Sequence, residues 1–126
     1  MAEVTGLDFV GVPSTDWQRS RAFYVDTLGL RGDQHSQAEF WVGDTCFAIW
    51  EPARFGVTFT PQTNAAFALR VEDIDAARAE LEAKGVRFVG DTFDTGVCKM
   101  APFVDPDGND VMLHSRYAPY RERNAE

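Results

Sequence analysis

The sequence carries the same order of structural signals twice, and this internal repeat is its strongest constraint on the fold. In the first copy, Asp16 is placed to cap a helix, and the helical pattern ends at Gly29, 13 positions later. In the second copy, the same pattern runs from Asp73 to Gly85, 12 positions later. An apolar strand precedes each helix, and further strands follow it. The repeat predicts two similar strand–helix–strand–strand–strand units.

Helices are expected over residues 17–28 and 74–84, and strands over residues 7–12, 38–42, 45–51, 65–71, 86–89, 97–104 and 111–114. The dipeptide Gly43-Asp44 favours a hairpin turn between two of these strands. Together the elements predict one domain over residues 5–116, with a first module at about 5–52, a linker at 53–63 and a second module at about 64–116. Residues 117–126 form a charged tail, which is expected to be ordered only when it docks on a partner.

Composition narrows the function. Apolar residues make up 44% of the chain, enough for a packed core, and the net charge is −8. That charge disfavours nucleic acids and anionic membranes as partners, and it permits cationic or neutral small ligands. The start has no signal-peptide pattern and no stretch is long enough to span a bilayer, so we expect a cytoplasmic protein. Cys46 and Cys98 lie far apart, and we expect buried free thiols, with pairing across the fold as the alternative.

Three motifs follow one another along the chain. They are Asp8-Phe9-Val10-Gly11-Val12 with Ser20-x-x-Phe23-Tyr24-x-x-x-Leu28-Gly29-Leu30, then Val71-Glu72-Asp73-Ile74-Asp75 with Leu81 to Gly85, then Asp105-Pro106-Asp107-Gly108-Asn109-Asp110-Val111-Met112-Leu113. In this order and at these separations the chain resembles the vicinal oxygen chelate superfamily, which contains glyoxalase I, extradiol dioxygenases, fosfomycin-modifying transferases and bleomycin resistance proteins. The resemblance covers residues 7–116.

The resemblance implies an α+β fold of two βαβββ modules, each a curled half-barrel sheet with its helix outside, and a homodimer for a chain of this length. Enzymes of the superfamily hold a divalent metal through ligands on the first and last strands of each module. Those positions correspond here to Phe9, Ala48, Ala66 and Met112. Three of these side chains have no donor atom, and a thioether is a poor ligand for hard divalent ions. We therefore expect neither a metal ion nor another cofactor.

Alternate residues of a strand share a face, so these positions define an inward face of the sheets. The residues expected to contact a ligand there are Phe9, Ala48, Trp50, Ala66, Arg70, Met112 and His114. The small residues among them, with Gly11 and Ala68, leave room, and Phe9 and Trp50 offer flat rings for stacking. The alternative is that these side chains fill the half-barrel.

The sequence does not determine where several further candidate pocket residues point. Trp41 and Phe88 are possible pocket residues whose facing is open, and Lys99 and Met100 could line a rim. His114 could instead be a strand-end imidazole bonded to the backbone, and His35 is expected in a solvated loop.

The expected function is a metal-independent protein that sequesters or carries an aromatic or cationic small molecule, as bleomycin resistance proteins do, with a role in antibiotic resistance. One alternative is a glyoxalase-like lyase, isomerase or dioxygenase, which would use an unaligned metal site or acid/base chemistry by His114, Glu51 or Arg70. Another is an interaction module with a filled barrel. No residue is assigned a catalytic role.

Overall fold

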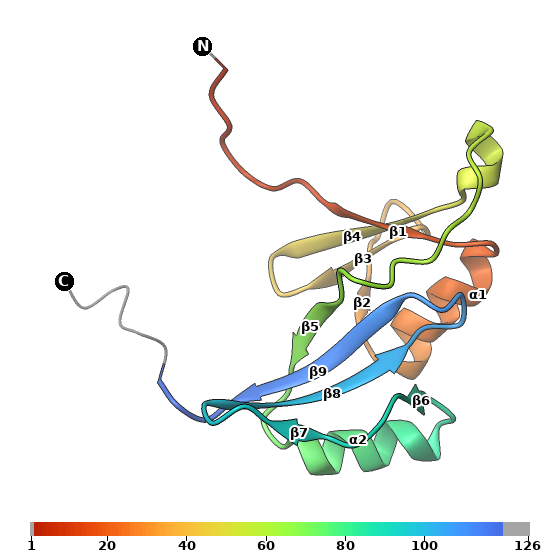
Figure 1. Cartoon of the computed structure of the whole chain (residues 1–126). Coiled ribbons are helices and arrows are strands. Elements are labelled where there is room, and N and C mark those ends of the chain that lie inside the picture. The colour runs from red at the N-terminus through yellow and green to blue at the C-terminus, as the bar shows by residue number, and fades with distance from the viewer. Residues whose placement is uncertain (1, 120–126) are drawn as a thin grey trace. The chain divides into compact units, whose positions relative to one another are not determined.

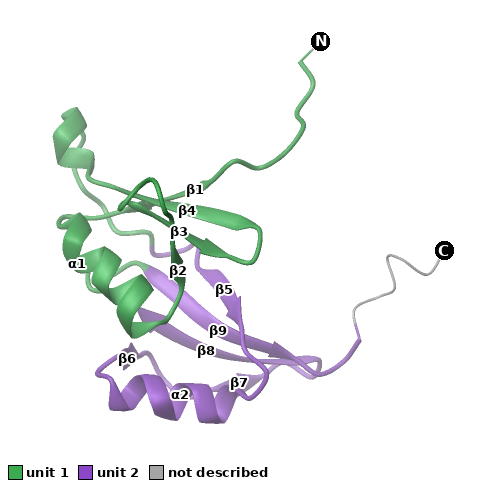
Figure 2. Cartoon of the chain, turned by 180° about the vertical axis from the view of Figure 1, so that it is seen from behind, with its two compact units in different colours: residues 1–62, 106–109 green, residues 63–105, 110–126 purple. Residues whose placement is uncertain are grey.

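The structure is a computed structural model that describes residues 2–119, and the chain divides into two compact units (Figures 1 and 2). Unit 1 contains the chain up to Gln62 together with the turn Pro106–Asn109, and unit 2 contains Thr63–Asp105 and the chain from Asp110 onward. The turn joins two strands of unit 2 but belongs to unit 1. Each unit has one sheet and its own helix, so the architecture is the expected mixed α+β fold with two sheets and few helices.

Unit 1 follows the predicted order of elements. They are β1 (Val10–Pro13), α1 (Trp17–Arg21), the π-helical turn η1 (Ala22–Thr27), β2 (Arg31–Gly32), β3 (Glu39–Val42), β4 (Thr45–Trp50) and the 3-10 helix η2 (Pro52–Phe55). The sheet order is β1-β4-β3-β2, with β1 parallel to β4 and the other pairs antiparallel. Because β1 and β4 are parallel, the chain must cross over between them, and α1 lies in this crossover connection.

The first helix forms where its caps predict. The Asp16 carboxylate accepts hydrogen bonds from the backbone N–H groups of Gln18 and Arg19, and the chain leaves the helix at Gly29 with φ of 79°. One face of the helical segment covers the sheet, because the Tyr24 ring stacks on Phe40 with ring centroids 4.7 Å apart. Phe40 in turn stacks on Phe47 at 5.4 Å. These rings are the aromatic core of unit 1.

The turn Pro106–Asn109 is anchored to unit 1 by two buried side chains. The Asn109 amide donates to the carbonyl of Pro13 at 2.9 Å and accepts from the N–H of Gln62 at 2.8 Å. The Asp107 carboxylate accepts from the N–H of Thr15 at 3.1 Å and from the Ser20 hydroxyl at 2.9 Å. Its side chain is 1% exposed, so these bonds replace the water that the carboxylate loses.

Unit 2 repeats the plan. Its elements are β5 (Phe67–Arg70), α2 (Ile74–Ala83), β6 (Arg87–Phe88), β7 (Phe93–Asp94), β8 (Cys98–Val104) and β9 (Asp110–Arg116). The order is β5-β9-β8-β6, with β7 also paired to β8, and β5 is parallel to β9. Asp73 caps α2 through the N–H of Ala76, and Gly85 follows the helix with φ of 91°. The Arg78 guanidinium lies 4.7 Å from the ring centroid of Phe88, which places α2 on the Phe88 face of the sheet.

Several predicted boundaries need correction. The first strand begins at Val10 rather than residue 7, because its parallel ladder with β4 starts at the Val10–Phe47 pair. The strand expected over residues 65–71 is β5, Phe67–Arg70, so Ala66 also precedes its strand. The two-residue strands β2 and β7 were not predicted as separate elements, and the expected linker contains η2.

The remaining predictions concern the tail and the cysteines. Tyr117 and Ala118 both donate backbone hydrogen bonds to the carbonyl of Val97, and the other part of the predicted tail, 120–126, lies outside the described residues. Cys46 and Cys98 are both buried free thiols. Among residues 2–119, no helix is long and apolar enough to cross a membrane.

Candidate functional site

Each sheet has one face that its helix leaves uncovered, and the strand register identifies the residues on it. In unit 1, Gly11 is paired with Ala48, Ala48 with Glu39, and Trp41 with Cys46, while the helix-covered face carries Phe40 and Phe47. Paired residues and alternate residues share a face. The open face of unit 1 therefore carries Gly11, Arg31, Glu39, Trp41, Ala48 and Trp50, together with the buried Cys46.

Trp50 lies at the C-terminal end of β4 with 38% of its surface exposed. Its ring lies over Gly11, where an added Cβ atom would be 3.5 Å from the indole Nε1. The Phe55 ring of η2 is tilted against it, with centroids 6.2 Å apart. A cavity of about 440 Å³ opens beside both rings and is also lined by Trp17, Glu51 and Arg54. This is a partly apolar site with an exposed indole, which a flat ligand can stack on.

The polar groups around this cavity are engaged. One Glu51 oxygen accepts from the N–H of Trp17 at 2.8 Å, and the other is paired with Arg54. Hydrogen bonds from Trp17 and then Arg54 lower the pKa of Glu51, so the carboxyl is held in its charged form. Glu51 therefore holds the start of α1 and the η2 segment in place. This is a structural role, whereas the sequence suggested an acid/base role for Glu51.

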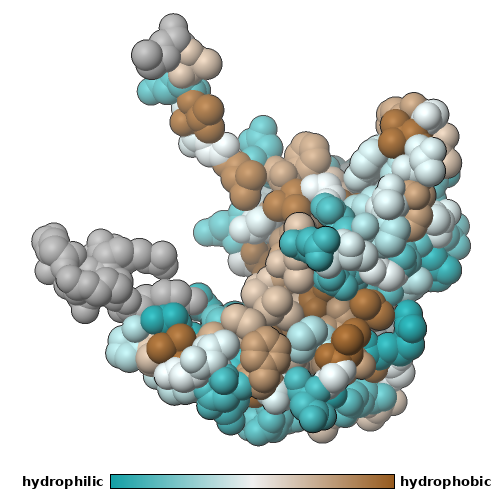
Figure 3. Space-filling model, in the orientation of Figure 1, coloured by the Kyte–Doolittle hydropathy of each residue, from teal (hydrophilic) through white to brown (hydrophobic). Residues whose placement is uncertain are grey.

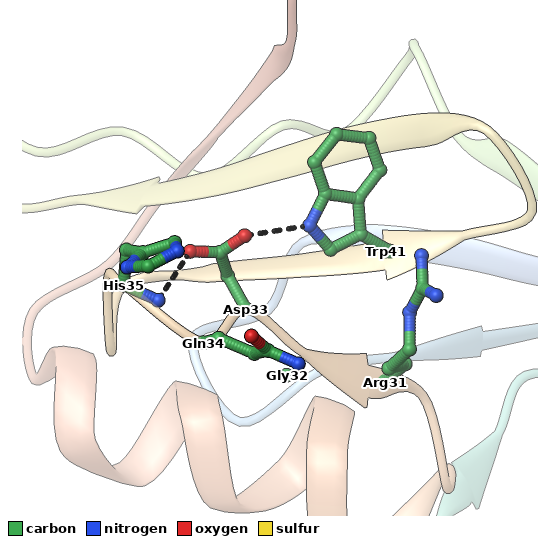
Figure 4. Close-up of a pocket in the computed structure, with 6 residues that line it drawn as sticks. All are labelled: Arg31, Gly32, Asp33, Gln34, His35 and Trp41. Carbon is green, nitrogen blue, oxygen red and sulfur yellow. Dashed lines mark hydrogen bonds between the residues drawn. The ribbon is translucent and has the colours of Figure 1, made fainter.

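Trp41 borders a second, smaller cavity of unit 1, of about 270 Å³ (Figure 4). Its indole N–H donates to the Asp33 carboxylate at 2.9 Å, and the Arg31 guanidinium lies 5.9 Å from its ring centroid. The bond from Trp41, followed by that from the His35 backbone, lowers the pKa of Asp33. His35 itself is exposed in the loop, as predicted. The aspartate thus fixes the orientation of the Trp41 ring.

The open face of unit 2 is built by the same register rule. Arg70 is paired with His114, Ala68 with Met112, and Met100 with His114, whereas Phe88 is paired with the buried Phe103 on the helix-covered face. The open face of unit 2 is the surface formed by Ala68, Arg70, Phe93, Met100, Met112 and His114. A cavity of about 440 Å³ lies at its end, lined by Arg70, Glu72, His114, Arg116 and Tyr117 among others.

The structure places the seven predicted ligand-contact residues in two groups. Ala48 and Trp50 lie on the open face of unit 1, and Arg70, Met112 and His114 lie on the open face of unit 2. Phe9 and Ala66 come just before β1 and β5, and Phe9 is 56% exposed. Trp50 and His114 each line a cavity of their own unit.

The strand register also shows on which face of its sheet each residue lies when the sequence alone left this open. Trp41 belongs to the open face of unit 1, while Phe88 packs under α2 and is no pocket residue. Met100 lies beside His114 on the open face, and Lys99, its neighbour, points to the other side. Glu39 and Arg31 are two further residues of the open face of unit 1, paired with Ala48 and Trp41. The hairpin predicted around Gly43-Asp44 places Glu39 opposite Ala48, so the sequence contains the signal for Glu39.

The side chains at the superfamily's metal positions do not fit a metal ion. Phe9, Ala48 and Ala66 have no donor atom, and Met112 offers only a thioether. Within residues 2–119, no group of three or more His, Cys, Asp or Glu side chains comes together in a way that could hold a metal.

Comparison with known proteins agrees with this architecture. Residues 6–113 match the model of the Glyoxalase/Bleomycin resistance protein/Dioxygenase superfamily. Protein YaeR of Escherichia coli (strain K12) is 30% identical, with 85% of this chain and 93% of YaeR covered. A glyoxalase family protein from Bacillus anthracis has a TM-score of 0.75 at 22% identity, with 92% of this chain and 98% of that one covered. TnmS3, an antibiotic binding protein from Streptomyces sp. CB03234, has a TM-score of 0.70 at 25% identity, with 92% and 99% covered. The chain belongs to the Glyoxalase/Bleomycin resistance protein/Dioxygenase superfamily.

Proposed function

We propose that the protein binds a small aromatic or cationic molecule on the open sheet faces and does so without a metal ion. The observation that carries the proposal is the position of Trp50. Its ring is 38% exposed, lies over Gly11 and borders a cavity of about 440 Å³. Its indole N–H has no hydrogen-bond partner among the described residues, so a ligand can use both the ring face and the donor.

The charges of unit 1 favour a cationic group on the ligand. Burial raises the pKa of the Cys46 thiol, and the negative charges of Glu39 and Asp33 raise it further. Glu39 and Asp33 stand here against one guanidinium, that of Arg31 over the Trp41 ring, so these three groups carry a net negative charge that favours a cation. Tryptophan is the best aromatic partner for a cation. An aromatic cation is therefore the ligand class that this face suits best.

The open face of unit 2 supplies a ligand-contact surface of its own, with Arg70, Met112 and His114 on it. Phe9 and Ala66, just outside β1 and β5, complete the set of proposed contacts. Of the three acid/base candidates, Glu51 is committed to the fold, and we propose His114 and Arg70 as ligand contacts and assign no catalytic residue.

One structural relative suggests a biological role for this binding. TnmS3 is an antibiotic binding protein, and its similarity to this chain extends over 92% of the sequence. Sequestration or carriage of a drug-like molecule, with resistance as the consequence, is the role that we propose by analogy.

Thermal-shift screening tests the proposal. Aromatic cations such as benzyltrimethylammonium should raise the melting temperature in a concentration-dependent manner, because a ligand that binds only the folded chain stabilises it. Divalent metal ions, added alone or before the compounds, should not. Stabilisation that requires a divalent ion would favour the enzyme alternative and contradict the proposal.

We also propose that the protein forms a homodimer in the cytoplasm. β1 and β5 are edge strands of their sheets, and the arm before β1 exposes the apolar side chains of Val4, Leu7 and Phe9. Figure 3 shows hydrophobic atoms along this arm. Unpaired edges and exposed apolar side chains are covered at low cost by a second copy of the chain.

A further inference from the structure

A row of four side chains crosses the open face of unit 2 from one edge to the other. The register pairs Phe93 of β7 with Met100 of β8, Met100 with His114 of β9, and His114 with Arg70 of β5. Neighbouring strands are about 4.8 Å apart, so the row extends over about 14 Å. It changes along its length from an aromatic ring and a thioether to an imidazole and a guanidinium.

The cationic end of this row is available for a ligand. Arg70 is exposed, and no hydrogen bond or ion pair engages its guanidinium anywhere in the described part of the chain. It lines the 440 Å³ cavity together with His114 and Arg116. Arg116 is already committed, because its guanidinium donates to the carbonyls of Ala118 and Pro119 at 2.8 and 3.1 Å.

The balance of charge at this cavity is unusual for the chain. Two arginines and a histidine line it against one acidic residue, Glu72, in a protein whose net charge is −8. No ion pair joins Glu72 to Arg70 among residues 2–119. An arginine fork matches the two oxygens of a carboxylate, and a charged partner makes such hydrogen bonds stronger.

The apolar end of the row is equally open. Phe93 is 47% exposed and Met100 is half-buried, so both can contact the hydrocarbon part of a bound molecule. A compound with an acid group at one end and an aromatic ring at the other would meet matching groups at both ends.

We infer that the open face of unit 2 binds an aryl-alkyl carboxylic acid, with its carboxylate at Arg70 and His114 and its ring against Met100 and Phe93. The inference rests on the proposed small-molecule binding function and names the chemical class for one of its two surfaces. The cationic groups at this cavity distinguish it from the cavity beside Trp50, where the two charged residues, Glu51 and Arg54, are paired with each other.

Three matched probes test the inference on the full chain by isothermal titration or by ligand-observed NMR. They are 4-phenylbutyrate, the neutral 4-phenylbutanol and the cationic 4-phenylbutylamine. At the site whose binding Arg70→Ala weakens, we expect the acid to bind at least about 10-fold more tightly than the other two, the lower limit for a charge-assisted hydrogen bond. Amine binding that Trp50→Ala removes belongs to the surface of unit 1 and is measured separately. Inorganic phosphate, which has no apolar part, should bind more weakly than the acid.

Two arginine variants provide the control. Arg70→Ala should weaken 4-phenylbutyrate binding by about 10- to 100-fold. Arg87→Ala removes the same charge from an exposed position of β6 outside the cavity and should leave the affinity unchanged. The melting temperature of both variants should stay close to that of the wild type. Equal binding of acid, alcohol and amine at the Arg70 site, an equal effect of both variants, or tighter binding of phosphate would overturn the inference.

The outcome is separable from that of the proposed function. If Trp50→Ala leaves the affinity for aromatic cations unchanged while Arg70→Ala weakens 4-phenylbutyrate binding, the proposed Trp50 surface is wrong and the acid site stands. The reverse result would leave the Trp50 surface intact and overturn the acid site.

Discussion

The indole ring of Trp50 covers Gly11, and a Cβ atom at position 11 would lie 3.5 Å from Nε1 of Trp50. That distance is an ordinary van der Waals contact, so alanine fits there and a longer side chain does not. Because the residue at position 11 is small, the Trp50 ring has room to lie over the strand. Trp50 therefore presents a flat surface at the end of β4 beside the cavity of unit 1.

Replacement of Trp50 tests whether this ring is a ligand contact or part of the core. Trp50→Ala should weaken binding of an aromatic cation by about 1–3 kcal/mol, as expected for the loss of a buried aromatic contact. The free energy of unfolding should fall by less than the ~3–5 kcal/mol that is typical of a fully buried aromatic residue. Titration calorimetry and urea denaturation measure the two quantities.

Two further variants serve as controls for that experiment. Trp50→Phe keeps a ring and should retain most of the affinity. Gly11→Leu keeps Trp50 but displaces its ring and should weaken binding. If Trp50→Ala unfolds the chain, the ring is core and the binding surface is wrongly placed.

Asp107 should make the stability of the protein sensitive to acid. Burial alone would raise its pKa, but the hydrogen bonds from Thr15, Ser20 and Ser14 together lower it below the ordinary value of 3.8. The folded state thus favours the carboxylate, and this stabilisation is present above about pH 4 and is lost as the pH falls through the folded pKa. Asp107→Asn should lower the free energy of unfolding at pH 7 by about 1–3 kcal/mol.

The pH dependence distinguishes this effect from a general loss of packing. The difference between wild type and Asp107→Asn in urea denaturation should shrink as the pH is lowered from 7 to 3. Asp26→Asn, at an exposed position of η1, should match the wild type throughout. A difference that stays constant with pH would show that the ionised carboxylate is not what stabilises the turn.

Metal ions should have no specific effect on this protein. Phe9, Ala48, Ala66 and Met112 cannot supply the oxygen or nitrogen ligands that hard divalent ions need. Elemental analysis of protein purified without a chelator should find less than one divalent ion per chain, and thermal melting should be the same with and without added metal. A stoichiometric ion that raises the melting temperature would show a site elsewhere on the chain.

The proposed dimer predicts a mass twice the 14.1 kDa of one chain. Light scattering at micromolar concentration measures it directly. Charged replacements in the arm, Leu7→Asp with Phe9→Asp, should shift the protein towards the monomer if the arm is buried in the interface. A wild-type mass of one chain would contradict the proposal.

The sequence predicted the elements whose signals are local. Asp16 and Asp73 cap the helices, Gly29 and Gly85 follow them, and the Gly43 turn joins the hairpin strands, because caps and turns depend on a few neighbouring residues. The lengths of β1 and β5 depend instead on where their partner strands begin and end, which no local pattern contains.

The directions of the side chains likewise divide into those that a single strand determines and those that depend on the register between strands. Counting by twos placed Ala48 with Trp50 and Met112 with His114, because alternation is a property of a single strand. The positions of Trp41 and Phe88 required the register between strands, and the row from Phe93 to Arg70 required three registers at once. The hydrogen bond from Trp41 to Asp33 joins a strand to a loop, which the sequence pattern alone does not predict.

Two-dimensional NMR of the indole N–H groups tests most directly whether the ligand contacts Trp50 on the open face of unit 1. The chain has three tryptophans, and their side-chain signals are assigned by single replacement of each. During titration with the aromatic cation that stabilises the protein most, the Trp50 signal should move first and saturate with the measured affinity, because its N–H is open to a ligand. If the compound binds and the Trp50 signal stays in place, the open face of unit 1 is not the binding surface.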